Sequence, residues 1–165
     1  VSAEGYETLL DNISKRLGMP AASREDAVAI IDAIDIPADI AAHIASKRDF
    51  IVVHDPRPLS VITSPLTVQG MARGTWYFEA DFPITLVDWD GRIIAQSHAS
   101  AVLDPEDPDS TWMTREFVPF QGTIAFEPPE ITGDFARRGT LILHKSNASG
   151  LSEHDDALEI PVRFE

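Results

Sequence analysis

The sequence predicts a mainly β protein, an antiparallel β-sandwich preceded by a small helical segment. From Phe50 onward, short runs rich in β-branched and aromatic residues are separated by clusters of Gly, Pro, Asp, Asn and Ser, which is typical of strands joined by turns. In the longest runs the apolar residues fall on every second position, as in a strand with one buried face. Before Phe50 they recur at helical spacing instead. We therefore divide the chain into a helical segment, residues 1–49, and a β domain, residues 50–165.

Two or three short helices are expected in the first segment. The first ends at Gly18, which suits a helix stop, and Pro20 prevents its continuation. Its apolar residues are Tyr6, Leu9, Leu10, Ile13 and Leu17. The second has Ser23 as its N-cap, and the third starts at Pro37 and places Ile40, Ala41 and Ile44 on one side. Because so short a segment cannot easily hold a core alone, we expect these helices to cap the β domain, pack on one another or contact a partner.

Eight strands are expected in the β domain, at residues 50–54, 60–63, 66–72, 75–88, 92–99, 114–126, 139–146 and 157–164. The fourth has an apolar face, formed by Trp76, Phe78, Ala80, Phe82, Ile84 and Leu86, and a mostly polar face, formed by Tyr77, Glu79, Asp81, Pro83, Thr85 and Val87. It ends at an Asp90-Gly91 hairpin turn. In the last strand the inward residues are Leu158, Ile160, Val162 and Phe164. Pro161 lacks a backbone N–H, which favours an edge strand. We expect the two apolar sets to be buried together.

Composition excludes several classes of function. The chain has 165 residues, of which 44% are hydrophobic, enough for a proper core. With 13 basic and 27 acidic residues its net charge is -14, which repels nucleic acid phosphates and anionic lipid headgroups. The absence of cysteine excludes disulfides and thiolate metal sites. No apolar run approaches the roughly 18 residues of a membrane span.

An acidic loop is the best candidate for a metal site. Its carboxylates belong to Asp104, Glu106, Asp107 and Asp109. Calcium takes about six to eight oxygen ligands, and this loop can supply some of them. The spacing is not that of an EF-hand, and two prolines stiffen the loop without placing its side chains on one side. The alternatives are therefore a solvated acidic loop and a calcium site.

No catalytic constellation is found. His154-Asp155-Asp156, His144 and His98 offer zinc ligands, but nothing in the sequence shows that they converge. The serines are not set in a Gly-x-Ser-x-Gly elbow. Glu79 and Asp81 share one face of a strand, which the alternation turns toward solvent, whereas a glycosidase pair needs a concave site. We predict that the protein is not an enzyme and uses no cofactor.

Two tryptophans are candidate binding residues. Trp89 lies at the predicted hairpin tip, where burial is least expected, and Trp112 follows the acidic loop. Both can serve as exposed anchors for a protein or glycan partner. The alternative is that each folds back over the end of the sandwich.

A series of short motifs runs through residues 51–165. They are Ser64-Pro65-Leu66, Val68, Gly70, Ala72, Phe78-Glu79, Asp90-Gly91, Pro119-Phe120, Gly139-Thr140-Leu141, Ser149-Gly150 and Ile160-Pro161-Val162. In their order and spacing the chain resembles the Gmad2 family, the immunoglobulin-like domain of bacterial spore germination proteins. The resemblance implies a non-catalytic, immunoglobulin-like antiparallel β-sandwich, carried by exported and often lipid-anchored proteins of the bacterial cell envelope.

The resemblance and the strand pattern together favour one function. We expect a binding or assembly module of an extracytoplasmic protein, which recognises a protein or cell-wall glycan partner. The alternative is a carbohydrate-binding β-sandwich, stiffened by calcium, with the two tryptophans as stacking surfaces. The chain begins at Val1 and shows no charged segment followed by an apolar one, so we expect any targeting segment or lipid anchor to lie upstream.

Overall fold

The computed structural model describes residues 36–165, so the first two predicted helices lie outside the described residues. The elements within this range are α3 (Ala38–Lys47), β1 (Ile51–Asp55), β2 (Val61–Ile62), β3 (Leu66–Arg73), η1 (Gly74–Trp76), β4 (Asp81–Asp88), β5 (Ile93–Ala101), β6 (Phe117–Ile124), η2 (Asp134–Arg137), β7 (Arg138–His144), η3 (Ser152–His154) and β8 (Ala157–Phe164). Here α3 is an α-helix and the η elements are single 3-10 turns. Each predicted strand therefore has a counterpart in the structure.

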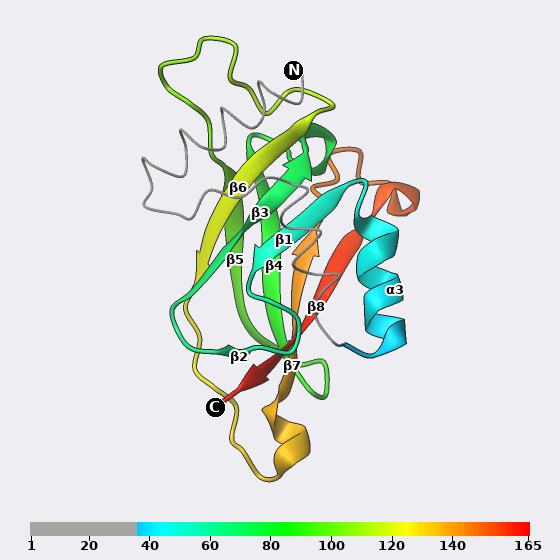
Figure 1. The fold of residues 1–165 in the computed structure, drawn as a ribbon, viewed down its shortest axis with the longest axis vertical. Coiled ribbons are helices and arrows are strands. Elements are labelled where there is room, and N and C mark those ends of the chain that lie inside the picture. Colours follow the sequence, from blue (N-terminus) through cyan, green and yellow to red (C-terminus); the bar gives the residue numbers. More distant parts are fainter. Residues whose placement is uncertain (1–35) are drawn as a thin grey trace.

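The strands form one sheet in the order β1-β3-β6-β5-β4-β7-β8-β2 (Figure 1). Neighbours are antiparallel, except that β2 runs parallel to the end of β8. The two halves of this order, β1-β3-β6-β5 and β4-β7-β8, reproduce the A-B-E-D and C-F-G sheets of an immunoglobulin domain. Pairing between β4 and β5 joins the halves into one hydrogen-bonded surface. The predicted immunoglobulin-like, mainly β class is confirmed.

One apolar core lies between the two halves of the sheet. The rings of Phe82 in β4 and Phe120 in β6 meet edge to face, 4.9 Å apart. Phe126 and Phe164 make a similar contact at 5.8 Å. Both contacts join segments that are not neighbours in the sheet, so the sheet must bend over on itself. The apolar sets of β4 and β8 are at most 1% exposed, as predicted: Phe82, Ile84, Leu86, Leu158, Ile160, Val162 and Phe164.

The fourth strand is shorter than predicted. It begins at Asp81 rather than at residue 75, and Gly74–Trp76 form the turn η1. Between them Glu79 and Ala80 have φ angles of 50° and 66°, in the left-handed region that few non-glycine residues adopt. Phe78 and Asp81 exchange backbone hydrogen bonds of 2.9 and 3.1 Å across this turn. The chain therefore reverses just before β4, where the alternation of the sequence predicts a continuous strand.

The reversal changes which aromatic rings are buried. Phe78, predicted to face inward, is 48% exposed, so that part of the prediction is wrong. Tyr77, predicted on the polar face, is buried; its hydroxyl donates to the Val118 carbonyl at 2.6 Å, and its ring packs edge to face on Phe82. Trp76 is buried as predicted, but from η1 rather than from a strand.

Helix α3 is the third predicted helix. Pro37 precedes its first residue and occupies the N-cap position. Asp39 lies in the first turn, where a negative charge interacts favourably with the helix dipole. The apolar side of the helix faces the sheet: Ile44 is buried in the core, and Ile40 packs against it. In Figure 1, α3 runs beside β8.

The outer edge of β8 is covered along its length. The Glu159 N–H donates to Nε2 of His43 in α3, at 3.0 Å. Further along, Pro161 has no N–H, and its carbonyl accepts the Leu59 N–H at 2.7 Å. The Arg163 N–H then donates to the Ser60 carbonyl at 2.9 Å, before β2 begins. Pro161 thus lies where the outer edge of β8, on the side away from β7, has no neighbouring strand, as its missing donor predicts.

Candidate functional site

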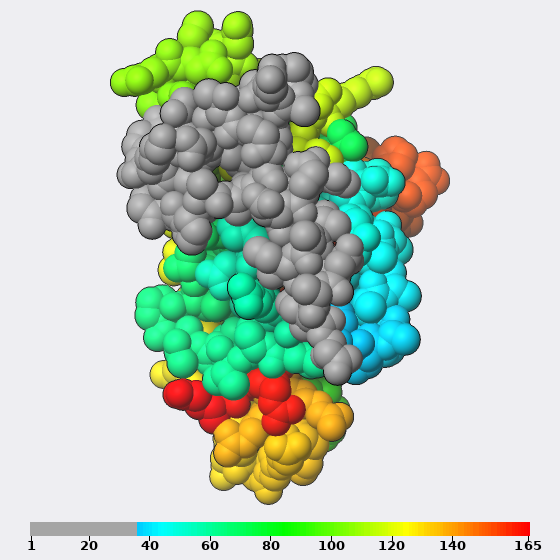
Figure 2. All heavy atoms as spheres, viewed as in Figure 1, coloured from blue at the N-terminus to red at the C-terminus, as the bar shows by residue number. Residues whose placement is uncertain are grey.

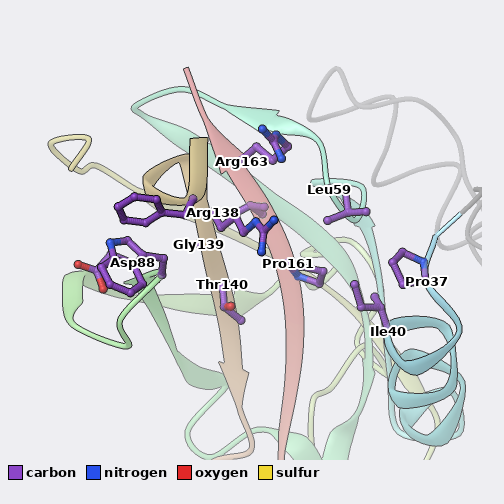
Figure 3. A pocket seen from close by; sticks show the side chains of 12 residues that line it. Pro37, Ile40, Leu59, Asp88, Arg138, Gly139, Thr140, Pro161 and Arg163 are labelled. Atoms are coloured by element: carbon purple, nitrogen blue, oxygen red, sulfur yellow. The ribbon is translucent and has the colours of Figure 1, made fainter. Parts of the chain in front are cut away.

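A groove crosses the outer face of β7 and β8 near the end of the sheet (Figure 3). Its volume is about 540 Å³, within the range of ligand sites of roughly 300–1,000 Å³. The lining comes from α3, the β1–β2 connection, the β4–β5 hairpin, η2, β7 and β8. The lining residues are Pro37, Ile40, Leu59, Asp88, Trp89, Phe135, Arg138, Gly139, Thr140, Pro161, Val162 and Arg163.

An exposed aromatic pair forms one end of this groove. Trp89 is 53% exposed and Phe135 is 46% exposed, and their rings meet edge to face at 4.9 Å and 83°. The predicted hairpin fixes Trp89: Oδ1 of Asp88 accepts the N–H groups of Asp90 and Arg92, each at 2.9 Å. Gly91 supplies the positive φ, 76°, that this turn requires. The indole is therefore held outside the core by its own turn.

The second tryptophan lies elsewhere. Trp89 precedes β5 and Trp112 follows it, so the two residues are at opposite ends of this strand. Trp112 is half-buried and packs against the core. Figure 2 shows the same separation, with residues 104–110 in light green at the top and the η2 region in orange at the bottom. The two tryptophans therefore do not form one binding surface.

Two of the four carboxylates of the acidic loop accept hydrogen bonds from the loop's own backbone. Oδ1 of Asp104 accepts the Glu106 N–H at 3.0 Å, and Oδ1 of Asp107 accepts the Asp109 N–H at 2.9 Å. Asp104 is half-buried and the other three acidic residues are exposed. Within residues 36–165, no three His, Asp or Glu side chains gather as a ligand set. Calcium binding by this loop stays a prediction of the sequence.

Two hydroxyl–imidazole contacts occur within residues 36–165, and neither lies in the groove. Ser149 Oγ and His154 Nδ1 are 3.0 Å apart in an exposed loop, where Asn147 Oδ1 also accepts from the serine hydroxyl. Thr85 Oγ1 and His144 Nε2 are 3.1 Å apart on the outer face of the sheet. A nucleophile and base need a concave site around the reacting atom. We therefore interpret both contacts as structural.

His54 is a buried titratable group in β1. Its two ring nitrogens are inaccessible, and neither makes a hydrogen bond within the described residues. Burial lowers the pKa of His54, while the Asp55 carboxylate and the nearby Gln69 side chain oppose this shift more weakly. Burial likewise lowers the pKa of His144, against the smaller effect of Glu159. The folded protein thus favours the neutral form of both rings.

This preference predicts a loss of stability in mild acid. As pH falls below about 6.5, the unfolded chain binds protons that folded His54 and His144 resist, so the free energy of unfolding decreases until each folded-state pKa is passed. Each histidine contributes at most about 1.4 kcal/mol per pH unit. Urea titrations between pH 8 and 5 measure the slope. The His54→Leu variant should have a shallower slope than the wild type, and equal slopes would contradict the assignment.

Several lining residues were not predicted as site residues. Three separate segments supply Leu59, Arg163 and the neighbouring pair Phe135 and Arg138, and only the fold brings these segments together. Of these residues, Phe135 alone could have been selected from the sequence, because it is an aromatic residue directly after the turn-rich segment 128–133.

Within residues 36–165, no helix has the length and apolar character that crossing a bilayer requires.

The strand order and the family comparison agree. The model of the Gmad2 family, described as the immunoglobulin-like domain of bacterial spore germination, matches residues 50–139, more than half of the chain. The match ends in β7, so the later motifs of the resemblance, including Ile160-Pro161-Val162, lie beyond it. No match is found among curated proteins or among solved structures. The chain belongs to the Gmad2 family of immunoglobulin-like domains of bacterial spore germination.

Proposed function

We propose that this chain is a non-catalytic binding module of an extracytoplasmic bacterial envelope protein, and that it recognises a protein partner through the groove beside Trp89. The observation that carries the proposal is the exposed Trp89–Phe135 pair, which a rigid turn holds at the end of a concave apolar surface. Aromatic residues next to pockets dominate the binding energy of many protein interfaces. The helical segment 1–49 would act as a cap, as the packing of α3 on β8 supports.

The chemistry of the lining favours a protein over a glycan. Sugars need several hydrogen-bond acceptors as well as flat aromatic faces. The groove offers the Thr140 hydroxyl and the Asp88 carboxylate, but Oδ1 of Asp88 already accepts two backbone N–H groups. The edge-to-face arrangement of Trp89 and Phe135 gives no common flat platform. Apart from Arg138 and Arg163, the remaining lining is apolar, which suits the side chains of a peptide.

The same lining supports the absence of catalysis. It contains no histidine, serine, cysteine or lysine, and its one carboxylate is bound to the hairpin backbone. Among the described residues, the Thr140 hydroxyl of this lining makes no hydrogen bond to a general base that would activate it. The extracytoplasmic location rests on membership of a spore germination family. Cell fractionation with an antibody against the chain tests this location directly.

The central test compares two exposed apolar residues at opposite ends of the molecule. Full-length wild type, Trp89→Ala and Met113→Ala would be immobilised and exposed to envelope extract, with protease-treated extract and purified cell wall as parallel samples. Immobilised Trp89→Ala should bind at least about tenfold less of the partner protein from the extract than the wild type does. Its free energy of unfolding should stay within about 1 kcal/mol of the wild-type value. Met113→Ala should retain both properties, because its side chain is exposed beyond the acidic loop.

Three results would contradict the proposal. If the immobilised chain bound purified cell wall but no protein from the extract, the carbohydrate-binding alternative would be favoured. Loss of retention in Trp112→Ala with unchanged stability would place the site at the other end of β5. Turnover of a substrate by the purified chain would exclude the non-catalytic interpretation.

A further inference from the structure

Two arginines face each other across the floor of the groove. Arg138 in β7 and Arg163 in β8 are direct cross-strand partners, and both line the groove (Figure 3). Directly opposite residues of an antiparallel pair have Cβ atoms about 4.5–5.5 Å apart, and like charges at this distance are destabilising. The sheet therefore keeps a repulsive pair at this position.

Within residues 36–165, Arg163 has an acidic partner and Arg138 has none. Asp134 Oδ1 accepts a hydrogen bond from Arg163 Nη2 at 3.1 Å. The guanidinium of Arg138, by contrast, makes no ion pair or hydrogen bond with any of residues 36–165. The nearby Asp88 carboxylate is directed to the hairpin backbone. In a chain of net charge -14, the groove thus presents a guanidinium that no carboxylate of the described residues compensates.

The surfaces on either side of these arginines are apolar. Leu59, Ile40 and Pro161 lie at β8 and beyond its outer edge (Figure 3). Trp89 follows β4, the neighbour of β7 on the other side, and Phe135 packs on Trp89. A guanidinium binds a carboxylate through two parallel hydrogen bonds, which a planar fork of donors favours. The groove thus presents an apolar surface, then the Arg138 guanidinium, then a second apolar surface. A ligand that complements all three carries a carboxylate between two apolar groups.

We infer that the groove binds an extended peptide segment of a partner protein in which an Asp or Glu is flanked by apolar side chains, with the carboxylate on Arg138. This inference rests on the proposed function and specifies its ligand. The charge of the groove, opposite to that of the chain as a whole, selects an acidic residue, and the apolar ends select its neighbours. The destabilising arginine pair is explained as the cost of holding this donor in place.

The test uses a displayed library of random eight-residue peptides, selected on full-length wild type and on Trp89→Ala in parallel. Peptides enriched on the wild type alone should contain Asp or Glu between apolar residues. The best peptide should lose at least about tenfold in affinity, or ~1.4 kcal/mol, when its acidic residue is changed to the amide or when Arg138 is changed to Gln. Arg138→Lys should restore part of the affinity, and selection on Arg138→Glu should enrich Lys or Arg instead.

The variants carry their own folding control. Arg138→Gln removes the repulsion with Arg163, so its melting temperature should equal or exceed that of the wild type. A lower melting temperature would show that Arg138 stabilises the fold and would overturn this explanation of the arginine pair. The affinity of Arg138→Gln can therefore be measured on a folded protein.

The outcomes separate this inference from the proposed function. Enriched apolar peptides without acidic residues, lost on Trp89→Ala but not on Arg138→Gln, would overturn the inference and leave the proposed function standing. Enrichment of no peptide, together with a self-association that Trp89→Ala abolishes, would identify a second copy as the occupant and overturn the inference. Retention of cell-wall glycan alone would overturn both.

Discussion

Gly70→Ala is expected to lower the free energy of unfolding by at least about 3 kcal/mol. A Cβ at Gly70 would lie 2.1 Å from the Val52 carbonyl oxygen and 2.8 Å from the ring of Phe120. The first obstacle is the backbone of β1, which cannot yield without loss of its pairing with β3. Chemical denaturation of the two proteins measures the difference.

Gly91→Ala is the matched control. Gly91 has a φ of 76°, but a Cβ at this position would meet no heavy atom within 4 Å, so the added methyl group introduces only conformational strain. That strain is worth about 1–2 kcal/mol. If Gly70→Ala lowers the free energy of unfolding no more than Gly91→Ala does, the backbone of β1 can move away from the added methyl group although it is paired with β3.

Trp76→Ala is expected to lower the free energy of unfolding by about 3–5 kcal/mol, and Trp76→Phe by about 1–2 kcal/mol. The side chain is only 2% exposed, and its Nε1–H has no hydrogen-bond partner within the described residues. Phenylalanine keeps much of the apolar contact and removes the unpaired donor, whose burial opposes folding. Alanine loses the contact as well and leaves a cavity.

The difference between the two Trp76 variants is the quantity to measure. Equilibrium unfolding of both proteins in urea gives it directly, provided that both unfold in a single transition. Equal losses in the two variants would show that the indole N–H contributes a favourable interaction. Tyr77→Phe is a useful contrast, because the Tyr77 hydroxyl does have a partner, so this variant loses a buried hydrogen bond.

Alternation predicted the strands where burial alone decides the structure. In β8 the inward and outward residues follow the pattern of the sequence, and Pro161 lies where no neighbouring strand needs its N–H. In β4 the inward residues follow the pattern from Asp81 onward, but Thr85, predicted on the polar face, is buried as well. Before that residue, Glu79 and Ala80 take a left-handed conformation that the two side chains themselves do not favour. Contacts distant in sequence, such as Tyr77 with Val118, determine that turn, and periodicity contains no information about them.

The candidate site was only partly predictable. Trp89 followed from its place at a hairpin tip, because turn chemistry is local. The importance of Arg138 depends on the register that places it opposite Arg163 and on the hairpin that brings Trp89 close. Neither relation is written in the residues around position 138. The sequence therefore indicated an exposed aromatic residue but not the surface that surrounds it.

The bond between α3 and β8 makes one amide proton a reporter of the groove. Pro37 and Ile40 line the groove, while His43, one turn further along α3, holds the Glu159 N–H. When the helix lifts from the strand, this N–H meets water and exchanges its hydrogen. The hydrogen-exchange rate of the Glu159 amide thus reports how often α3 separates from β8 at this wall of the groove. A ligand that contacts both the helix and the strand should slow this exchange.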